Sequence, residues 1–210
     1  MKVFVIGASG RVGQELVKDL AAAGHHVSAG TRHVDQDFGP DVQTVAFDLH
    51  GSVEEMSLAM KGNDAVYFVA GSRGADLLQT DAFGVVKTSQ AAEAAGIKRY
   101  LLLSSLFATD PSKWHIGELN SLSDYNVAKF FGDHWLMDNT HLNYTILQPG
   151  TLKDEPGTGH VALGVTDGGV NPIPDVAATL VALLDADNTV KKIVTMHTGD
   201  TPIEAAVAGV

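Results

Sequence analysis

Three glycines near the start of the chain constrain its fold more than any other feature. An apolar run at residues 3–6 ends at the segment GASGRVG, residues 7–13, after which Val12, Leu16 and Leu20 fall four apart. This order predicts a buried strand, a tight turn and an amphipathic helix. Glycines at such a turn let backbone and helix approach closely, and the N–H groups at the helix start can face phosphates. The segment therefore predicts a dinucleotide-binding unit, with GxxGxxG spacing in place of the commoner GxGxxG.

Apolar, β-branched runs alternate with helical patterns along the rest of the chain. This alternation indicates right-handed strand–helix–strand units around a parallel sheet. The predicted fold class is therefore α/β, with a Rossmann-type doubly wound parallel sheet of about seven strands. We expect strands near residues 2–6, 26–30, 43–47, 64–70, 98–103, 143–148 and 192–197, and helices near residues 11–23, 53–61, 80–95, 123–137, 175–185 and 202–208.

The length of 210 residues suits one domain, spanning residues 1–210. Residues 150–174, with six glycines and three prolines, are expected to form a small substrate-side loop region, including a short strand over the ligand-binding edge of the sheet. Residues 105–122 are predicted to form a loop long enough to act as a lid. Helix-capping boxes are expected at Ser52 with Glu55 and at Thr201 with Glu204.

Composition excludes several classes of partner and site. A formal charge of −11 opposes binding to nucleic acid or an anionic membrane, and no apolar run approaches the roughly 20 residues of a membrane helix. The chain has no cysteine, which suits a reducing compartment, and no histidine pair has the spacing of a helical metal site. We therefore expect a cytoplasmic protein with no metal.

The few arginines follow predicted strands. Arg11, Arg32 and Arg73 come after the first, second and fourth strands. Because ligands of open parallel sheets bind where the strands end, an acidic chain with cations there is suited to hold an anion.

Tyr125 and Lys129 stand four residues apart at the start of a predicted helix and share one face. A phenol ionises at about pH 10, and a nearby ammonium group favours the phenolate. Such a pair can exchange a proton with a hydroxyl or a carbonyl. Ser104 and Ser105 end the fifth predicted strand, where their hydroxyls can bond to a substrate oxygen.

Together these positions resemble the short-chain dehydrogenase/reductase superfamily, and more narrowly its atypical branch of small NAD(P)-binding, NmrA-like and epimerase-like oxidoreductases. The resemblance covers nearly the whole chain and implies strand order 3-2-1-4-5-6-7. It rests on the glycine turn, Asp48, Ala70-Gly71, Ser104-Ser105, Tyr125 with Lys129, and Pro149-Gly150.

The resemblance also implies roles for these residues. Tyr125 would be the catalytic acid/base, Lys129 would bind the nicotinamide ribose and tune Tyr125, and Ser105, or less favourably Ser104, would orient the carbonyl. The cofactor-binding set would comprise Gly7, Ser9, Gly10, Arg11, Val12, Gly13, Thr31, Arg32, Asp48, Leu49, Ala70, Gly71, Lys129 and Pro149.

The end of the second strand favours NADP (NADPH) over NAD. An acidic residue there would hold a ribose 2′-hydroxyl, but the chain has Thr31 and Arg32, which suit a 2′-phosphate. Asp35 and Asp37 follow closely and argue the other way.

The predicted function is hydride transfer between NADP(H) and a small carbonyl or alcohol substrate. Two alternatives stay open: a flavin- or quinone-type NADPH reductase, in which Tyr125 would be dispensable, and a non-catalytic NADP(H)-sensing regulatory protein. We expect a small-molecule substrate as partner, no nucleic acid or membrane, and a monomer or homodimer.

Overall fold

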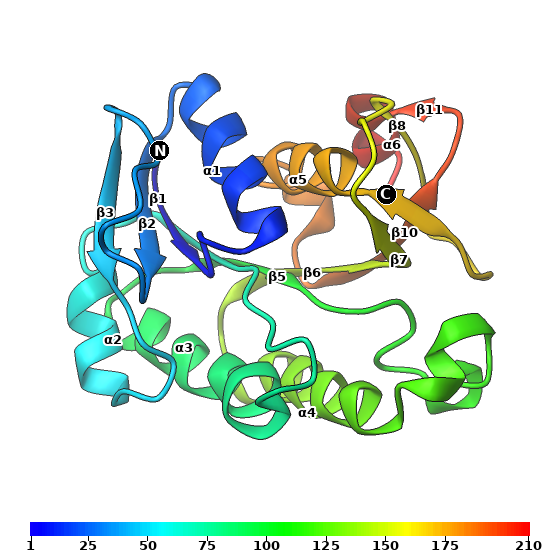
Figure 1. Cartoon of the computed structure of the whole chain (residues 1–210), viewed down its shortest axis with the longest axis horizontal. Helices are drawn as coiled ribbons and strands as arrows, with labels where there is room; N and C mark the ends of the chain where they lie inside the picture. Colours follow the sequence, from blue (N-terminus) through cyan, green and yellow to red (C-terminus); the bar gives the residue numbers. More distant parts are fainter.

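The computed structural model describes residues 1–210 apart from the side chain of Glu118. A nine-stranded sheet lies between two helical layers, with α1, α5 and α6 on one face and α2, α3 and α4 on the other (Figure 1). The strands of this sheet are β1 (Lys2–Ile6), β2 (His26–Thr31), β3 (Val42–Ala46), β4 (Ala65–Phe68), β5 (Arg99–Leu103), β6 (Asn143–Pro149), β8 (His160–Leu163), β10 (Lys192–Thr198) and β11 (Thr201–Pro202). The helices are α1 (Arg11–Ala22), α2 (Val53–Met60), α3 (Phe83–Ala94), α4 (Ser123–Asn139), α5 (Ile173–Ala182) and α6 (Ile203–Ala208).

The parallel part of the sheet runs β3-β2-β1-β4-β5-β6-β10. The predicted fold class and the order 3-2-1-4-5-6-7 are thereby confirmed, with β10 as the seventh strand. We call the side of the sheet where these strands end the carboxyl edge.

Two further strands, β8 and β11, extend the sheet beyond these seven parallel strands, and β8 runs antiparallel to both of its neighbours. The short strand expected over the carboxyl edge instead lies in the plane of the sheet, where Leu163 of β8 pairs with Met196 of β10. This pairing satisfies backbone groups that β10 would otherwise leave free. A separate two-stranded sheet joins β7 (Thr151–Lys153) to β9 (Val170–Pro172).

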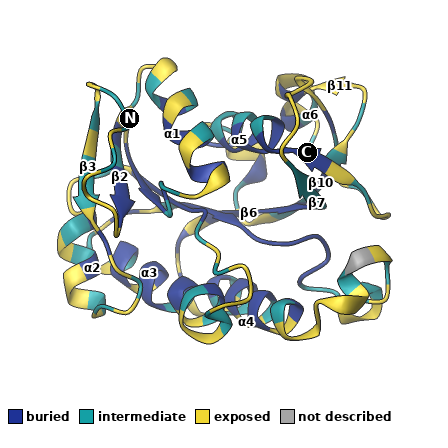
Figure 2. Ribbon diagram, viewed as in Figure 1, coloured by how far each residue is buried: buried dark blue, intermediate teal, exposed yellow. Residues whose placement is uncertain are grey.

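The core divides into two clusters, one on each face of the sheet. Along β1, Val3 and Val5 pack under α1 and α5, whereas Phe4 and Ile6 face α2 and α3. Burial on both faces is what a parallel sheet covered by two helical layers requires, and Figure 2 shows the central strands largely buried. Among the described residues, no helix is both long and apolar enough to cross a bilayer.

Of the two capping boxes expected from the sequence, one is confirmed. The capping box of Ser52 and Glu55 is present at the start of α2. The one expected at Thr201 and Glu204 was wrong, because Thr201 belongs to β11 and α6 begins after Pro202 without a side-chain cap. The helix expected at residues 80–95 begins with a π-helical turn, η1 (Leu77–Ala82), which continues into α3.

Candidate active site at the carboxyl edge

The glycine turn after β1 is packed so closely that two of its glycines admit no side chain. Gly7 has φ +85°, and a β-carbon there would lie 2.7 Å from the backbone of Ala70. At Gly13, a β-carbon would lie 2.2 Å from the Gly7 carbonyl oxygen. Gly10 differs, since that same oxygen, at 3.2 Å, is the one neighbour within 4 Å. Gly7 and Gly13 thus hold α1 against β1 and β4, while Gly10 leaves backbone open to a ligand.

The first turn of α1 offers free hydrogen-bond donors. Its N-cap residue is Gly10, which has no side chain that could cap the helix. The backbone N–H groups of Arg11, Val12 and Gly13 have no acceptor among the described residues. Such a helix start fits a phosphate group, and Ser9 lies within the same turn.

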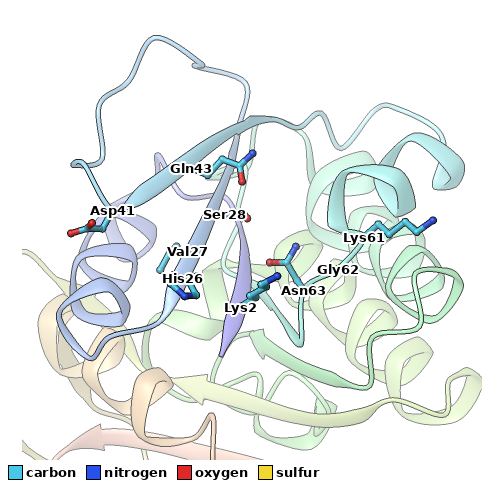
Figure 3. Close-up of a pocket in the computed structure, with 9 residues that line it drawn as sticks. All are labelled: Lys2, His26, Val27, Ser28, Asp41, Gln43, Lys61, Gly62 and Asn63. Carbon is cyan, nitrogen blue, oxygen red and sulfur yellow. The ribbon is translucent and has the colours of Figure 1, made fainter.

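Arg11 also reaches across the carboxyl edge to the segment after β7. Its guanidinium group lies 2.8 Å from the Asp154 carboxylate. A shallow pocket beside this ion pair is lined by Arg11, Gln14, Glu15, Asp154, Glu155, Pro156, Ile173 and Pro174. Another pocket, drawn in Figure 3, opens at Lys2 and His26, where β1 and β2 begin, and is therefore on the edge opposite the glycine turn.

Two loops meet where the adenosine half of a dinucleotide is expected. The His50 ring nitrogens lie 3.2 Å from Asp48 and 3.1 Å from Asp76, which joins the loop after β3 to the segment after β4. The pKa of Asp48 is lowered, chiefly because the His50 backbone N–H donates to it; burial opposes this, and the His50 ring and Arg32 add to the lowering. Thr31 is buried, and its hydroxyl accepts the His33 backbone N–H at 3.0 Å. Arg32 is exposed, and its guanidinium group has no ion-pair partner among the described residues.

The other expected cofactor residues also follow strands at this edge. Ala70 and Gly71 come after β4, and the Leu49 carbonyl, after β3, accepts a hydrogen bond from Lys87. Pro149 ends β6, and its carbonyl accepts the Leu106 N–H at 2.9 Å.

Tyr125 and Lys129 lie together on the first two turns of α4. The Lys129 ammonium group is 5.6 Å from the centre of the Tyr125 ring. Tyr125 is partly exposed, and its hydroxyl makes no hydrogen bond to any described residue. The expected pair is therefore formed, with the phenol free to meet a ligand.

Lys129 is buried against two carboxylates that sequence reasoning missed. Its side chain is 4% exposed, and its ammonium group lies 3.4 Å from Asp81. Burial lowers the pKa of Lys129, but Tyr125, Asp81 and Asp133 raise it, and the net direction is upward. Lys129 is thus held as a buried cation.

Ser104 and Ser105 differ in what their hydroxyls contact. Ser104 donates to Asp133 at 2.8 Å, and Gln148 donates to the same carboxylate oxygen at 2.9 Å. Ser105 is only 9% exposed, yet its hydroxyl makes no hydrogen bond to any described residue. Ser105 is therefore the serine whose hydroxyl is available to a ligand.

The 105–122 loop, expected as a lid, is anchored to α4. Trp114 donates its indole N–H to the Phe107 carbonyl at 3.0 Å and meets Phe130 of α4 edge-on at 6.1 Å. Phe107 has φ 56°, a strained conformation for a bulky residue. The segment also contains two short 3₁₀ turns, η2 (Pro111–Lys113) and η3 (Gly117–Ser121). These contacts fix the chain just beyond Ser105.

One family model and several known proteins are similar to this chain. A family model described as NAD(P)H-binding matches residues 7–187. A Bacillus subtilis protein named an uncharacterized sugar epimerase, YhfK, is 38% identical over 99% of both chains. The crystal structure of the oxidoreductase ylbE from Lactococcus lactis has a TM-score of 0.96 and 40% identity, covering 100% of this chain and 96% of that one.

Proposed function

Because the chain belongs to the NAD(P)H-binding family, in its NmrA-like and epimerase-like branch, we propose that it is an NADP(H)-dependent oxidoreductase acting on a small carbonyl or alcohol substrate. The observation that carries this proposal is the free phenol of Tyr125 beside the buried cation Lys129. Ser105 follows β5, whose end lies at the carboxyl edge, and α4, which carries Tyr125 and Lys129, comes after it in the chain.

The glycine turn fits the cofactor. Its unpartnered N–H groups and the open side of Gly10 suit the pyrophosphate, while the contacts of Gly7 and Gly13 keep the turn in place. Arg32 suits a 2′-phosphate beyond β2. When bound, a nicotinamide cofactor supplies or accepts the hydride.

The remaining steps belong to the chain's own side chains. In reduction, Tyr125 donates its proton to the substrate oxygen, and the Ser105 hydroxyl donates a hydrogen bond to the same oxygen. The Lys129 ammonium group stabilises the negative charge left on the phenol. In oxidation, Tyr125 removes the proton from the substrate hydroxyl.

Replacing Tyr125 tests the proposal. Tyr125→Phe keeps the ring beside Lys129 but removes the acid, so NADPH-dependent turnover of small aldehydes and ketones is expected to fall by about 100-fold or more. NADPH affinity, measured by fluorescence titration, should stay close to that of the unmodified protein. Tyr144→Phe, which alters a buried tyrosine near the start of β6, is the matched control and should retain turnover.

Two results would contradict this function. Full turnover by Tyr125→Phe, particularly with flavins or quinones, would favour a reductase that needs no phenol. Tight NADPH binding without consumption of NADPH across aldehydes, ketones, flavins and quinones would favour a nucleotide-sensing protein.

A further inference from the structure

Asp81 is a buried carboxylate that the mechanism above does not use. It lies in the π-helical turn η1, and its side chain is 0% exposed. One carboxylate oxygen, Oδ2, accepts hydrogen bonds from the backbone N–H and the hydroxyl of Ser72. The other, Oδ1, makes no hydrogen bond and faces the Lys129 ammonium group at 3.4 Å. Because a buried charge is costly without an opposite charge, these two groups depend on each other.

Around Asp81, η1 packs directly against α4. A β-carbon at Gly132 of α4 would lie 3.4 Å from the Asp81 carbonyl oxygen and 3.3 Å from the Val85 side chain. A β-carbon at Gly71 would lie 3.5 Å from Asp81 Oδ1. The Asp81 carboxylate thus lies next to the segment after β4, while the backbone of η1 and the Val85 side chain pack against Gly132 of the helix that carries Lys129. Single π-helical turns of this kind are frequent at functional sites.

Few other charged groups face Lys129. Tyr125 and Asp133 lie one helical turn away on either side of it in α4, and Asp81 is the one that comes from another element. The Oδ2 oxygen of Asp133 already accepts hydrogen bonds from Ser104 and Gln148, and no ion pair joins Asp133 to Lys129 among the described residues. Asp81 is therefore the direct counter-ion.

We propose that Asp81 is a positioning residue, which holds the Lys129 ammonium group beside Tyr125 and, through Ser72, ties that group to the segment after β4. The inference rests on the proposed function, because it assigns Asp81 a part in the reaction of Tyr125. Asp81 acts through Lys129 and touches neither substrate nor cofactor in this scheme. Asp81 thereby links the position of the Lys129 ammonium group to the segment after β4, which is proposed to line the cofactor.

The charge of Lys129 tests this directly. In Asp81→Asn the side chain keeps its shape and loses its charge, so one of the attractions that oppose the cost of burying Lys129 is removed. The NMR titration midpoint of the Lys129 side chain, assigned with Lys129→Met, should fall by about one pH unit or more. An unchanged midpoint would overturn the proposal.

Ser72→Ala is the matched control. It removes a hydrogen bond from Asp81 but leaves the carboxylate, so the Lys129 midpoint should stay above that of Asp81→Asn. If Ser72→Ala reproduced the full shift, the charge of Asp81 would not be its cause, and the proposal would fail.

A double variant keeps the test usable if Asp81→Asn does not fold. Asp81→Asn with Lys129→Met removes both charges and should melt at a higher temperature than Asp81→Asn alone, since no unpaired ammonium group remains buried. Strictly additive losses, or a double variant that fails to fold while Lys129→Met folds, would refute the pairing.

Turnover supplies the functional readout. In Asp81→Asn the alkaline limb of the kcat/KM profile should move to lower pH, because Lys129 loses its proton earlier. The titration and melting experiments need no substrate. Lack of turnover in the unmodified protein would therefore contradict the proposed function without contradicting the ion pair between Asp81 and Lys129. If Tyr125→Phe is inactive but the kcat/KM profile of Asp81→Asn matches that of the unmodified protein, the proposed role of Asp81 is contradicted and the proposed function is not.

Discussion

Asp133 shows how one buried residue links stability to pH. Burial raises the pKa of its carboxyl group from 3.8 to about 6, against hydrogen bonds from Ser104 and Gln148 and the charge of Lys129. Since the folded protein holds this proton more tightly than the unfolded chain, stability falls as pH rises from about 4 through 6. The stability lost across that window is on the order of 3 kcal/mol.

Asp133→Asn should remove this dependence. The amide oxygen can still accept from Ser104 and Gln148, while the cost of a buried charge disappears. Urea unfolding should show the variant gaining stability relative to the unmodified protein as pH rises from about 4 to 8, by up to roughly 3 kcal/mol. Parallel stability curves for the two proteins would contradict the assignment.

At the residue scale, sequence reasoning found the groups that carry a local signal. Tyr125 and Lys129 are four apart on one helix, and the structure brings them together. Asp133 continues the same face four residues later, a signal that was present but unused. Asp81 had no such signal, because its approach to Lys129 depends on how η1 packs against α4.

The start of α1 separates what a glycine does for the fold from what it does for a ligand. At Gly13 a methyl group would lie 2.2 Å from the Gly7 carbonyl oxygen, whereas at Gly10 it would meet that oxygen alone, at 3.2 Å. Gly13→Ala should therefore destabilise the protein by about 1–3 kcal/mol. Gly10→Ala should change stability by less than about 1 kcal/mol but weaken NADPH binding, because its methyl group would occupy the backbone's contact with the phosphates.

Urea unfolding and NADPH titration of both variants check this pair. Equal loss of stability in the two would show that the open side of Gly10 is needed for packing. Unchanged NADPH affinity in Gly10→Ala would show that the phosphates lie elsewhere.

At the element scale, alternating patterns were enough to locate the seven parallel strands and the six helices, because each carries its own period of apolar residues. The strands β8 and β11 were not predicted as part of the main sheet. They are short, and their positions depend on the free side of β10, which exists only once the sheet has formed. The π-helical turn η1 before α3 was not predicted either, because the apolar pattern of residues 80–95 does not distinguish a π-helical from an α-helical turn.

For the whole molecule, cofactor binding should appear as a gain in thermal stability. A ligand that binds only the folded state at 100 times its Kd adds about 2.7 kcal/mol. For a chain of this size that gain raises Tm by roughly 5–10 °C. At equal concentrations NADPH should raise Tm more than NADH, because the exposed Arg32 can pair with a 2′-phosphate.

Thermal denaturation with each nucleotide, repeated with Arg32→Ala, measures this preference. The variant should lose most of the difference between the two nucleotides. A larger shift with NADH in the unmodified protein would reverse the cofactor assignment.

The strand β11 also bears on how copies of the chain can associate. It is two residues long, ends in Pro202, which has no N–H to donate, and closes the side of the sheet that begins at β10. An edge strand this short offers few backbone hydrogen-bonding groups to a strand from another molecule. Strand addition is therefore disfavoured at this margin of the nine-stranded sheet, and β3 is the other margin of that sheet.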